Sequence, residues 1–200
     1  MWTPFRWSGL RGAAVTCLMS LVACVRAPVS TEPQPSTVVS EPVRASLRPE
    51  AALAAKGLII PVKGVDPSRV RDSYSAARGG RTHDAVDIMA PRGTPVIAAD
   101  SGTIFRLRQN AAGGITIYQL DADERFVYYY APLDRYESGL AEGMKVRQGD
   151  VLGFVGTTGN APKDLPHLHF QVMLYRGRGQ YWGGDPINPH PFLTRSERKQ

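Results

Sequence analysis

From Leu58 onward the chain is a succession of short apolar segments separated by turn residues, and this pattern limits the fold more than any other feature. Twenty Gly and sixteen Pro favour many turns and short strands over long helices. The predicted strands cover residues 85–89, 94–98, 102–108, 115–120, 126–131, 151–155 and 167–174. The one predicted helix is short, covers residues 50–56 and ends at Gly57.

Two parts of the chain repeat one pattern. Gly93-Thr94-Pro95-Val96 is followed by Gly102-Thr103-Ile104, and Gly143-Met144-Lys145-Val146 is followed by Gly149-Asp150-Val151-Leu152-Gly153. Each part consists of a glycine turn, a strand, a second glycine turn and a second strand. We therefore expect two similar hairpin units packed face to face. The fold class that this predicts is all-β, a small antiparallel β-sandwich or flattened barrel built on a duplicated motif.

The first residues have the features of a secretory signal. Arg6 and Arg11 provide positive charge, and residues 12–23 form an apolar run too short to span a bilayer stably. The run ends in Leu21-Val22-Ala23-Cys24, which resembles the lipobox of bacterial lipoproteins. We expect a signal peptide at residues 1–23, lipidation of Cys24, a disordered Pro/Ser/Thr-rich tether at 24–50 and a folded domain at 51–200. A plain signal peptide with an incidental cysteine is the alternative.

The remaining bulk properties narrow the choice of partners. The formal net charge is +6, but the basic residues are scattered except in the tail at 195–199. A nucleic-acid partner would require them to gather on one face, so we expect none. Attraction to an anionic cell envelope explains the charge. Both cysteines, Cys17 and Cys24, lie in the first 24 residues, which leaves the folded part without a disulfide or a thiolate metal site.

Three of the four histidines form a candidate metal site with one aspartate. His167 and His169 point to one face of a strand about 6.6 Å apart, so one can bind a metal while the other reaches a water on it. His83 and Asp87 would stand about 13 Å apart in a regular strand, so the chain must bend at residues 84–85 for both to reach one ion. Two imidazoles and a carboxylate are the ligands of a catalytic zinc with an open position. We expect His190, which lies among prolines, at the surface.

The order of these motifs resembles the lysostaphin/LytM-type zinc endopeptidases over residues 59–193. The resemblance is carried by His83-x-x-x-Asp87 with residues 88–96 after it, by residues 149–156, and by Pro166-His167-Leu168-His169-Phe170. It implies a small antiparallel β domain that cuts cross-linking peptides of peptidoglycan. It also implies that His83, Asp87 and His169 bind Zn²⁺ and that His167 is the general base.

One position departs from the family pattern. Where the family has a further catalytic histidine in Tyr-Ala-His-Leu, this chain has Tyr130-Ala131-Pro132-Leu133, and proline has no donor. The loss of a donor to the developing oxyanion typically costs about 10²–10³ in rate. Tyr128, Tyr129, Tyr130 and Arg135 are candidate replacements, although the alternating tyrosines should face core and groove in turn, so at most one need touch substrate.

Pro132 therefore leaves two functions open. The first is an envelope-anchored zinc endopeptidase that hydrolyses amide bonds in peptidoglycan peptides. The second is a non-catalytic zinc-binding module of the LytM type that regulates a cell-wall amidase. A third hypothesis is a purely structural envelope lipoprotein. The candidate metal site argues against it. Val25, rather than aspartate, follows Cys24, which by resemblance to enterobacterial lipoproteins favours attachment to the outer membrane facing the periplasm.

Overall fold

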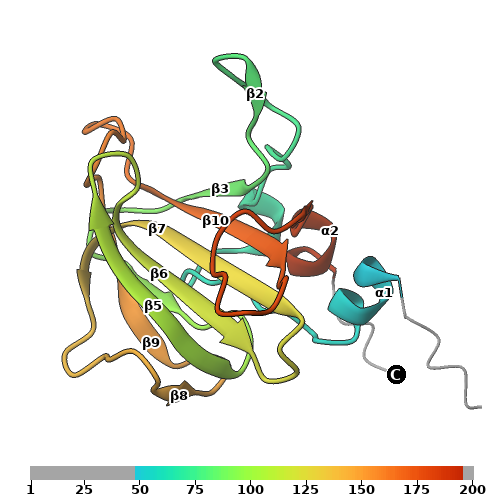
Figure 1. Ribbon diagram of the computed structural model, residues 1–200. Helices are drawn as coiled ribbons and strands as arrows, with labels where there is room; N and C mark the ends of the chain where they lie inside the picture. The colour runs from blue at the N-terminus through green and yellow to red at the C-terminus, as the bar shows by residue number, and fades with distance from the viewer. Residues whose placement is uncertain (1–47, 196–200) are drawn as a thin grey trace, which may run out of the picture. The chain divides into compact units, whose positions relative to one another are not determined.

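A nine-stranded antiparallel sheet forms the framework of the described part of the chain (Figure 1). The computed structural model describes residues 48–195, which lie within a compact unit formed by residues 42–200. The expected signal peptide, Cys24 and almost all of the expected tether lie outside the described residues. Among the helices that the structure describes, none has the length and apolar character needed to cross a bilayer.

The elements follow one another with short connections. In chain order they are α1 Pro49–Ala54, the 3₁₀ turn η1 Pro67–Arg69, β1 Ala77–Arg78, β2 Arg81–Thr82, β3 Val86–Met89, β4 Pro95–Ile97, β5 Gly102–Asn110, β6 Gly114–Asp121, β7 Phe126–Tyr136, β8 Lys145–Val146, β9 Val151–Val155, β10 His167–Leu174, β11 Pro186–Ile187 and α2 His190–Leu193. Each predicted strand is confirmed to within a few residues. The predicted short helix is confirmed as α1, and Gly57 follows it at φ +61°.

Strand β10 occupies the position that matters for the site. Its residues pair with β7 on one edge, where His169 is opposite Ala131. On the other edge β10 pairs with β3, where His169 is opposite Asp87, and further along with β11. The sheet continues from β7 through β6 and β5 to β8. His169 and Asp87 are therefore held side by side by backbone pairing.

The two faces of this sheet have different roles. The inner face of β7 carries Tyr128 and Tyr130, which are fully buried and pack against Phe170 of β10. Burying such a side chain stabilises the fold by about 1.5–3 kcal/mol. The outer face carries Tyr129 and a smaller cluster that includes Tyr118 and Met173. Because side chains alternate along a strand, Asp87 and His169 are on this outer face, away from the main core.

The repeated pattern produces strands that pair between the two repeats. β4 of the first repeat pairs with β9 of the second, and the start of β5 pairs with β8. The glycine that begins each repeat also bonds to the other repeat. The Gly93 amide donates to Val155 O, and the Gly143 amide donates to Ile104 O. The expectation of two separate hairpin units was therefore wrong, because the repeats exchange partners instead of each closing on itself. The all-β antiparallel class is confirmed, and residues 48–195 form no closed barrel.

Helix α1 is fixed to the sheet by one apolar and one charged contact. Leu53 is fully buried in the main core. After the helix, Lys56 Nζ lies 2.5 Å from Asp121 Oδ2, and the Asp121 side chain is fully buried. Asp121 Oδ1 accepts hydrogen bonds from the amides of Arg125 and Phe126. The carboxylate thus joins α1 to the β6–β7 turn.

Candidate metal centre

A sharp bend between β2 and β3 brings His83 to the sheet. Asp84 has φ +59°, a left-handed conformation that aspartate adopts more readily than most residues. The amides of His83 and Asp84 bond back to Ala76 O and Tyr74 O. The bend expected at residues 84–85 is confirmed, with His83 in the connection and Asp87 on β3.

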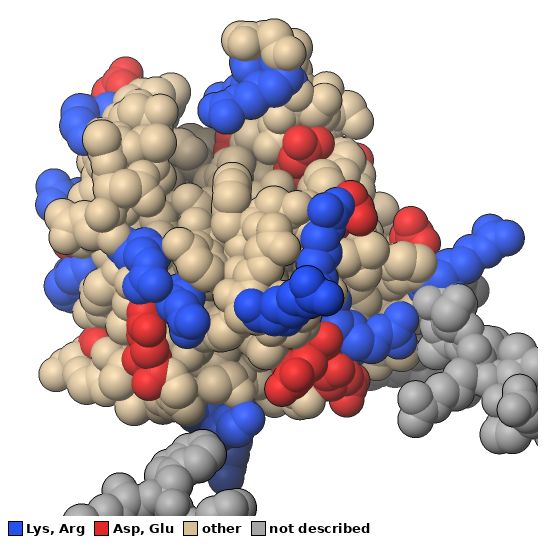
Figure 2. All heavy atoms as spheres, viewed as in Figure 1, with Lys and Arg blue, Asp and Glu red and all other residues tan. Residues whose placement is uncertain are grey.

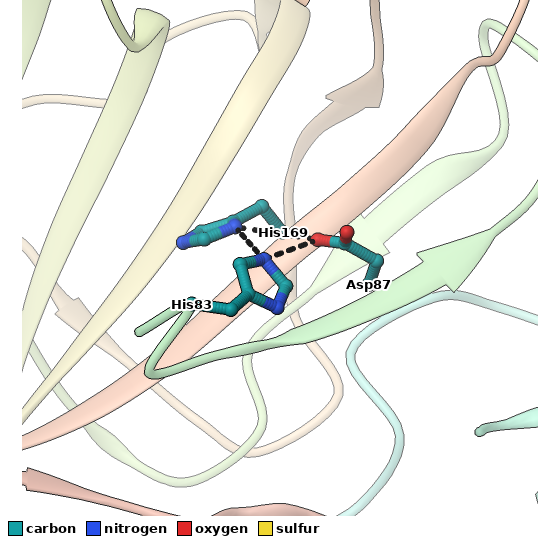
Figure 3. A group of neighbouring side chains, drawn as sticks. All are labelled: His83, Asp87 and His169. Atoms are coloured by element: carbon teal, nitrogen blue, oxygen red, sulfur yellow. Dashed lines mark hydrogen bonds and ion pairs between the residues drawn. The ribbon is translucent and has the colours of Figure 1, made fainter. Parts of the chain in front are cut away.

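Three candidate ligand atoms from distant parts of the chain lie close together (Figure 3). His83 Nε2 lies 2.9 Å from His169 Nδ1 and 3.1 Å from Asp87 Oδ1. His169 Nδ1 lies 3.3 Å from the same oxygen. The structure therefore brings together the three residues that the sequence singled out as ligands.

The backbone around the site fixes how His83 presents its ring. His83 Nδ1 lies 2.9 Å from Ser73 O, so the proton belongs on Nδ1 and the Nε2 lone pair faces the cluster. Ser73 Oγ accepts a hydrogen bond from the Asp87 amide. Ser73 thus positions two of the three candidate ligands, His83 through its carbonyl and Asp87 through its hydroxyl. It is a residue that sequence reasoning missed as part of the site, because its contribution comes from a backbone carbonyl as much as from its side chain.

The donor set fits a zinc ion. Ligands about 2.0–2.1 Å from a tetrahedral metal stand about 3.3 Å from one another, close to the distances found between these three atoms. Asp87 Oδ1 is buried and makes no well-aligned hydrogen bond among the residues described. A buried carboxylate oxygen is costly without a partner, and a cation at the point of convergence would supply one.

The electrostatics favour the protonation states that a metal requires. Burial would raise the pKa of Asp87, but interactions with His169, His83 and His167 lower it to about 2. Burial lowers the pKa of His169, against the opposing effect of Asp87. An ionised carboxylate beside a neutral imidazole is the ligand form of both groups.

His167 stands beside the cluster without joining it. Its Nε2 lies 3.9 Å from Asp87 Oδ1, farther than either ligand nitrogen. Its Nδ1 lies 2.7 Å from Leu165 O, which places the proton on Nδ1 and leaves Nε2 as an acceptor on the side of the site. This is the arrangement expected of a base that takes a proton from a water at the site.

Four residues were candidates to replace the hydrogen-bond donor that the family has where this chain has Pro132, and the structure places them differently. Tyr128 and Tyr130 lie in the core, where their hydroxyls donate to Asp100 Oδ2 and Gln119 Oε1, so both were wrong as candidates. Arg135 stacks its guanidinium 3.8 Å from the Phe154 ring centre. Tyr129 alone of the three tyrosines faces the site, with its ring centre 5.9 Å from that of His169. Burial raises its pKa, so the hydroxyl keeps its proton.

Arg78 is a second residue at the site that sequence reasoning missed. It belongs to β1, and its Nη2 donates to Asp87 Oδ2 at 2.5 Å and lies 3.4 Å from His83 Nε2. The sequence shows only an arginine nine residues before Asp87, a spacing with no meaning until the hairpin folds back.

His190 is not part of the cluster. We expected it at the surface, but the structure places it partly inside. It is half-buried, and its Nε2 lies 3.0 Å from Val70 O. It connects the start of α2 to the segment that precedes β1.

Comparison with known sequences places this geometry in a family. The model of "Peptidase family M23" matches residues 81–189, more than half of the chain. An L-Ala–D-Glu endopeptidase of Bacillus subtilis is 33% identical over 136 residues, covering 64% of this chain and 40% of that protein. The DD-carboxypeptidase/endopeptidase Mpg of Neisseria meningitidis is 37% identical over 126 residues, covering 59% of this chain and 26% of that protein. The chain thus spans less than half the length of either relative.

Solved structures agree with the sequence comparison. The catalytic domain of the antimicrobial peptidase lysostaphin from Staphylococcus simulans superposes with a TM-score of 0.51 at 30% identity, covering 62% of this chain and 88% of that domain. The resemblance drawn from the order of the motifs is confirmed. The chain belongs to peptidase family M23.

Proposed function

We propose that the protein is a zinc-dependent endopeptidase that hydrolyses amide bonds in peptidoglycan peptides. The observation that supports this most is the convergence of His83 Nε2, Asp87 Oδ1 and His169 Nδ1 with His167 beside them. Membership of family M23 and the similarity to an L-Ala–D-Glu endopeptidase support the substrate class.

The residues divide the chemistry between them. A zinc ion held by His83, Asp87 and His169 would polarise the scissile carbonyl and acidify an attacking water. His167 Nε2 accepts the proton of that water and returns it to the leaving amine. Tyr129, protonated and next to His169, is the candidate donor to the developing oxyanion.

A second function is favoured by one observation, the proline at position 132. Without the family's donor, the domain would bind zinc and peptidoglycan without cutting, and would serve as a regulator of a cell-wall amidase. The complete ligand set favours the enzyme, because a regulator has no need to hold two imidazoles and a carboxylate around one point.

One experiment separates these functions. The purified protein is loaded with zinc, and release of fragments from purified peptidoglycan is followed by chromatography, with His167→Ala as the control. We expect about one zinc per chain and cleavage that His167→Ala abolishes. Zinc without cleavage would favour the regulator, and cleavage gained by Pro132→His would then identify the missing donor as the cause.

We also propose that a lipid on Cys24 holds the protein to the outer membrane, facing the periplasm. The proposal rests on residues 21–24 and on the tether that follows them. Replacement of Cys24 by Ser removes the acylation site. The variant should move from the membrane fraction to the soluble fraction, and mass spectrometry of the wild-type N-terminus should show acyl chains on Cys24. An unmodified N-terminus at another residue would contradict the anchor.

A further inference from the structure

The β1–β2 hairpin projects from the domain next to the metal centre (Figure 1). Figure 2 shows blue arginine side chains on this projection, beside a hollow in the surface. Of its two arginines, Arg78 reaches the metal ligands, where Nη2 donates to Asp87 Oδ2 at 2.5 Å. Asp87 Oδ1 faces the two ligand nitrogens, so Arg78 contacts the oxygen on the other side of the carboxylate.

This contact leaves most of the guanidinium unused. Arg78 contacts two of the described residues, Asp87 and His83, and both contacts are made by Nη2. The Arg78 side chain is 50% exposed, and its Nε and Nη1 make no hydrogen bond with residues 48–195. A guanidinium offers five N–H donors in a planar fork that matches a carboxylate. Arg78 is therefore fixed through Nη2 alone, and its other N–H donors remain available beside the metal centre.

Another arginine near the domain surface does not share this property. Arg92 donates from Nε to Asp134 Oδ1 at 2.7 Å and from Nη2 to the same oxygen, so one carboxylate already occupies its fork. Arg81, in the same hairpin as Arg78, makes no side-chain hydrogen bond or ion pair with residues 48–195, and so it does not contact the candidate metal ligands. Arg78 alone of these three combines open donors with contact to the ligand set.

We propose that Arg78 binds a carboxylate of the peptide substrate and makes the enzyme selective for acidic peptides over their amidated forms. Nη2 lies 3.4 Å from the ligand atom His83 Nε2, so an anion on the exposed donors sits within roughly two residues of the scissile bond. The inference rests on the proposed endopeptidase function and adds the charge of its substrate. Arg78 acts here as a specificity-determining residue, and its contact with Asp87 positions it.

The test uses pairs of synthetic muropeptide stems that differ in one group, a free carboxylate or a carboxamide next to the scissile bond. The kcat/KM ratio of acid to amide is measured for the zinc-loaded full chain and for Arg78→Ala, Arg78→Lys and Arg81→Ala. A charge-assisted bidentate contact is typically worth about 10- to 100-fold. We expect that preference in the wild type and in Arg81→Ala, a ratio near unity in Arg78→Ala, and an intermediate ratio in Arg78→Lys.

A ratio of kcat/KM values cancels any general loss of activity, and zinc per chain is measured alongside it. An unchanged ratio in Arg78→Ala, with zinc bound and the amide still cut, overturns the inference and leaves the proposed function intact. Loss of zinc from both Arg78→Ala and Arg78→Lys also overturns it, because Arg78 would then serve only to hold Asp87.

A binding measurement keeps the inference testable if the wild type cuts neither peptide, a result that would overturn the proposed function alone. Calorimetry on zinc-loaded His167→Ala, with and without Arg78→Ala, gives the dissociation constants of the acid and the amide. Tighter binding of the acid that depends on Arg78 supports the inference, and equal binding of both peptides overturns it.

Discussion

Asp87 is the residue on which the proposed metal centre depends most. Its Oδ1 lies within 3.3 Å of both candidate ligand nitrogens, and it would supply the negative charge of the ligand set. Replacement by Asn keeps the shape of the side chain but removes that charge. We expect Asp87→Asn to weaken zinc binding by at least about 100-fold, measured by competition with a chelating dye. Asp84→Asn, which changes a carboxylate outside the cluster at a φ that asparagine tolerates, should bind zinc like the wild type. Equal affinity of Asp87→Asn and the wild type would exclude Asp87 as a ligand.

His167 should separate metal binding from catalysis. Because its Nε2 stands 3.9 Å from Asp87 Oδ1, outside the ligand cluster, His167→Ala should retain zinc. The loss of a positioned base should lower kcat by about 10²–10⁴. The matched control is His190→Ala, which removes a histidine outside the cluster whose Nε2 lies 3.0 Å from Val70 O. Wild-type kcat in His167→Ala would rule it out as the base.

At this scale the sequence predicted the candidate ligands better than their supports. Metal ligands are restricted to a few residue types, so spacing and strand geometry pointed to His83, Asp87, the pair His167 and His169, and a bend at residues 84–85. The choice of His169 over His167 as the third ligand came from the family resemblance. Ser73 and Arg78 contact the ligands through a backbone carbonyl and through a hairpin that folds back. Neither contact has a pattern in the sequence, because any residue has a carbonyl and surface arginines are common.

Among the elements, the end of β9, where it pairs with β7, depends on the absence of a side chain at Gly156. A Cβ at Gly156 would lie 2.2 Å from the Asp134 amide nitrogen and 2.3 Å from Leu133 C, both backbone atoms that cannot rotate away. We expect Gly156→Ala to lower the free energy of unfolding by about 3 kcal/mol, measured by urea denaturation. Gly139→Ala has open space around its Cβ and a φ of +79°, so it should cost only about 1–2 kcal/mol. A smaller loss for Gly156→Ala than for Gly139→Ala would contradict the close approach.

The docking of α1 depends on the buried carboxylate of Asp121. Lys56→Met would keep the aliphatic stem but remove the cation 2.5 Å from Asp121 Oδ2, in a side chain that is fully buried. We expect a loss of about 3 kcal/mol in the free energy of unfolding, because the charge of Asp121 would be left uncompensated.

The control for that change is the second partner of Lys56. The Asp123 side chain is 67% exposed, so Asp123→Asn should cost less than about 1 kcal/mol. Equal losses for Lys56→Met and Asp123→Asn would show that burial of Asp121 does not set the strength of the contact.

The sequence predicted the longer elements well. β5, β6, β7 and β10 have eight or more residues each, enough for an apolar segment between turn residues to be recognised. β8 and β11 have two residues each, too few for any periodicity, and their pairing comes from the partner strand. The exchange of partners between β4 and β9 joins residues more than fifty positions apart, which local patterns do not encode.

At the scale of the described domain, the candidate site lies on the outer face of a sheet whose inner face packs against the core. β10 contributes His167 and His169 to the outer face and Leu168 and Phe170 to the inner one, so the strand that stabilises the domain also holds the site. The class of fold followed from the turns and alternation in the sequence. The arrangement of the two repeats did not, since it depends on tertiary pairing.

The central claim is that His83, Asp87 and His169 bind one zinc ion and leave a position open. It is tested most directly by crystals of the zinc-loaded protein, with anomalous diffraction measured on both sides of the zinc absorption edge. We expect a single peak about 2.0–2.2 Å from His83 Nε2, Asp87 Oδ1 and His169 Nδ1, with His167 Nε2 outside bonding distance. A peak elsewhere, or the three side chains turned apart with solvent between them, would contradict the claim.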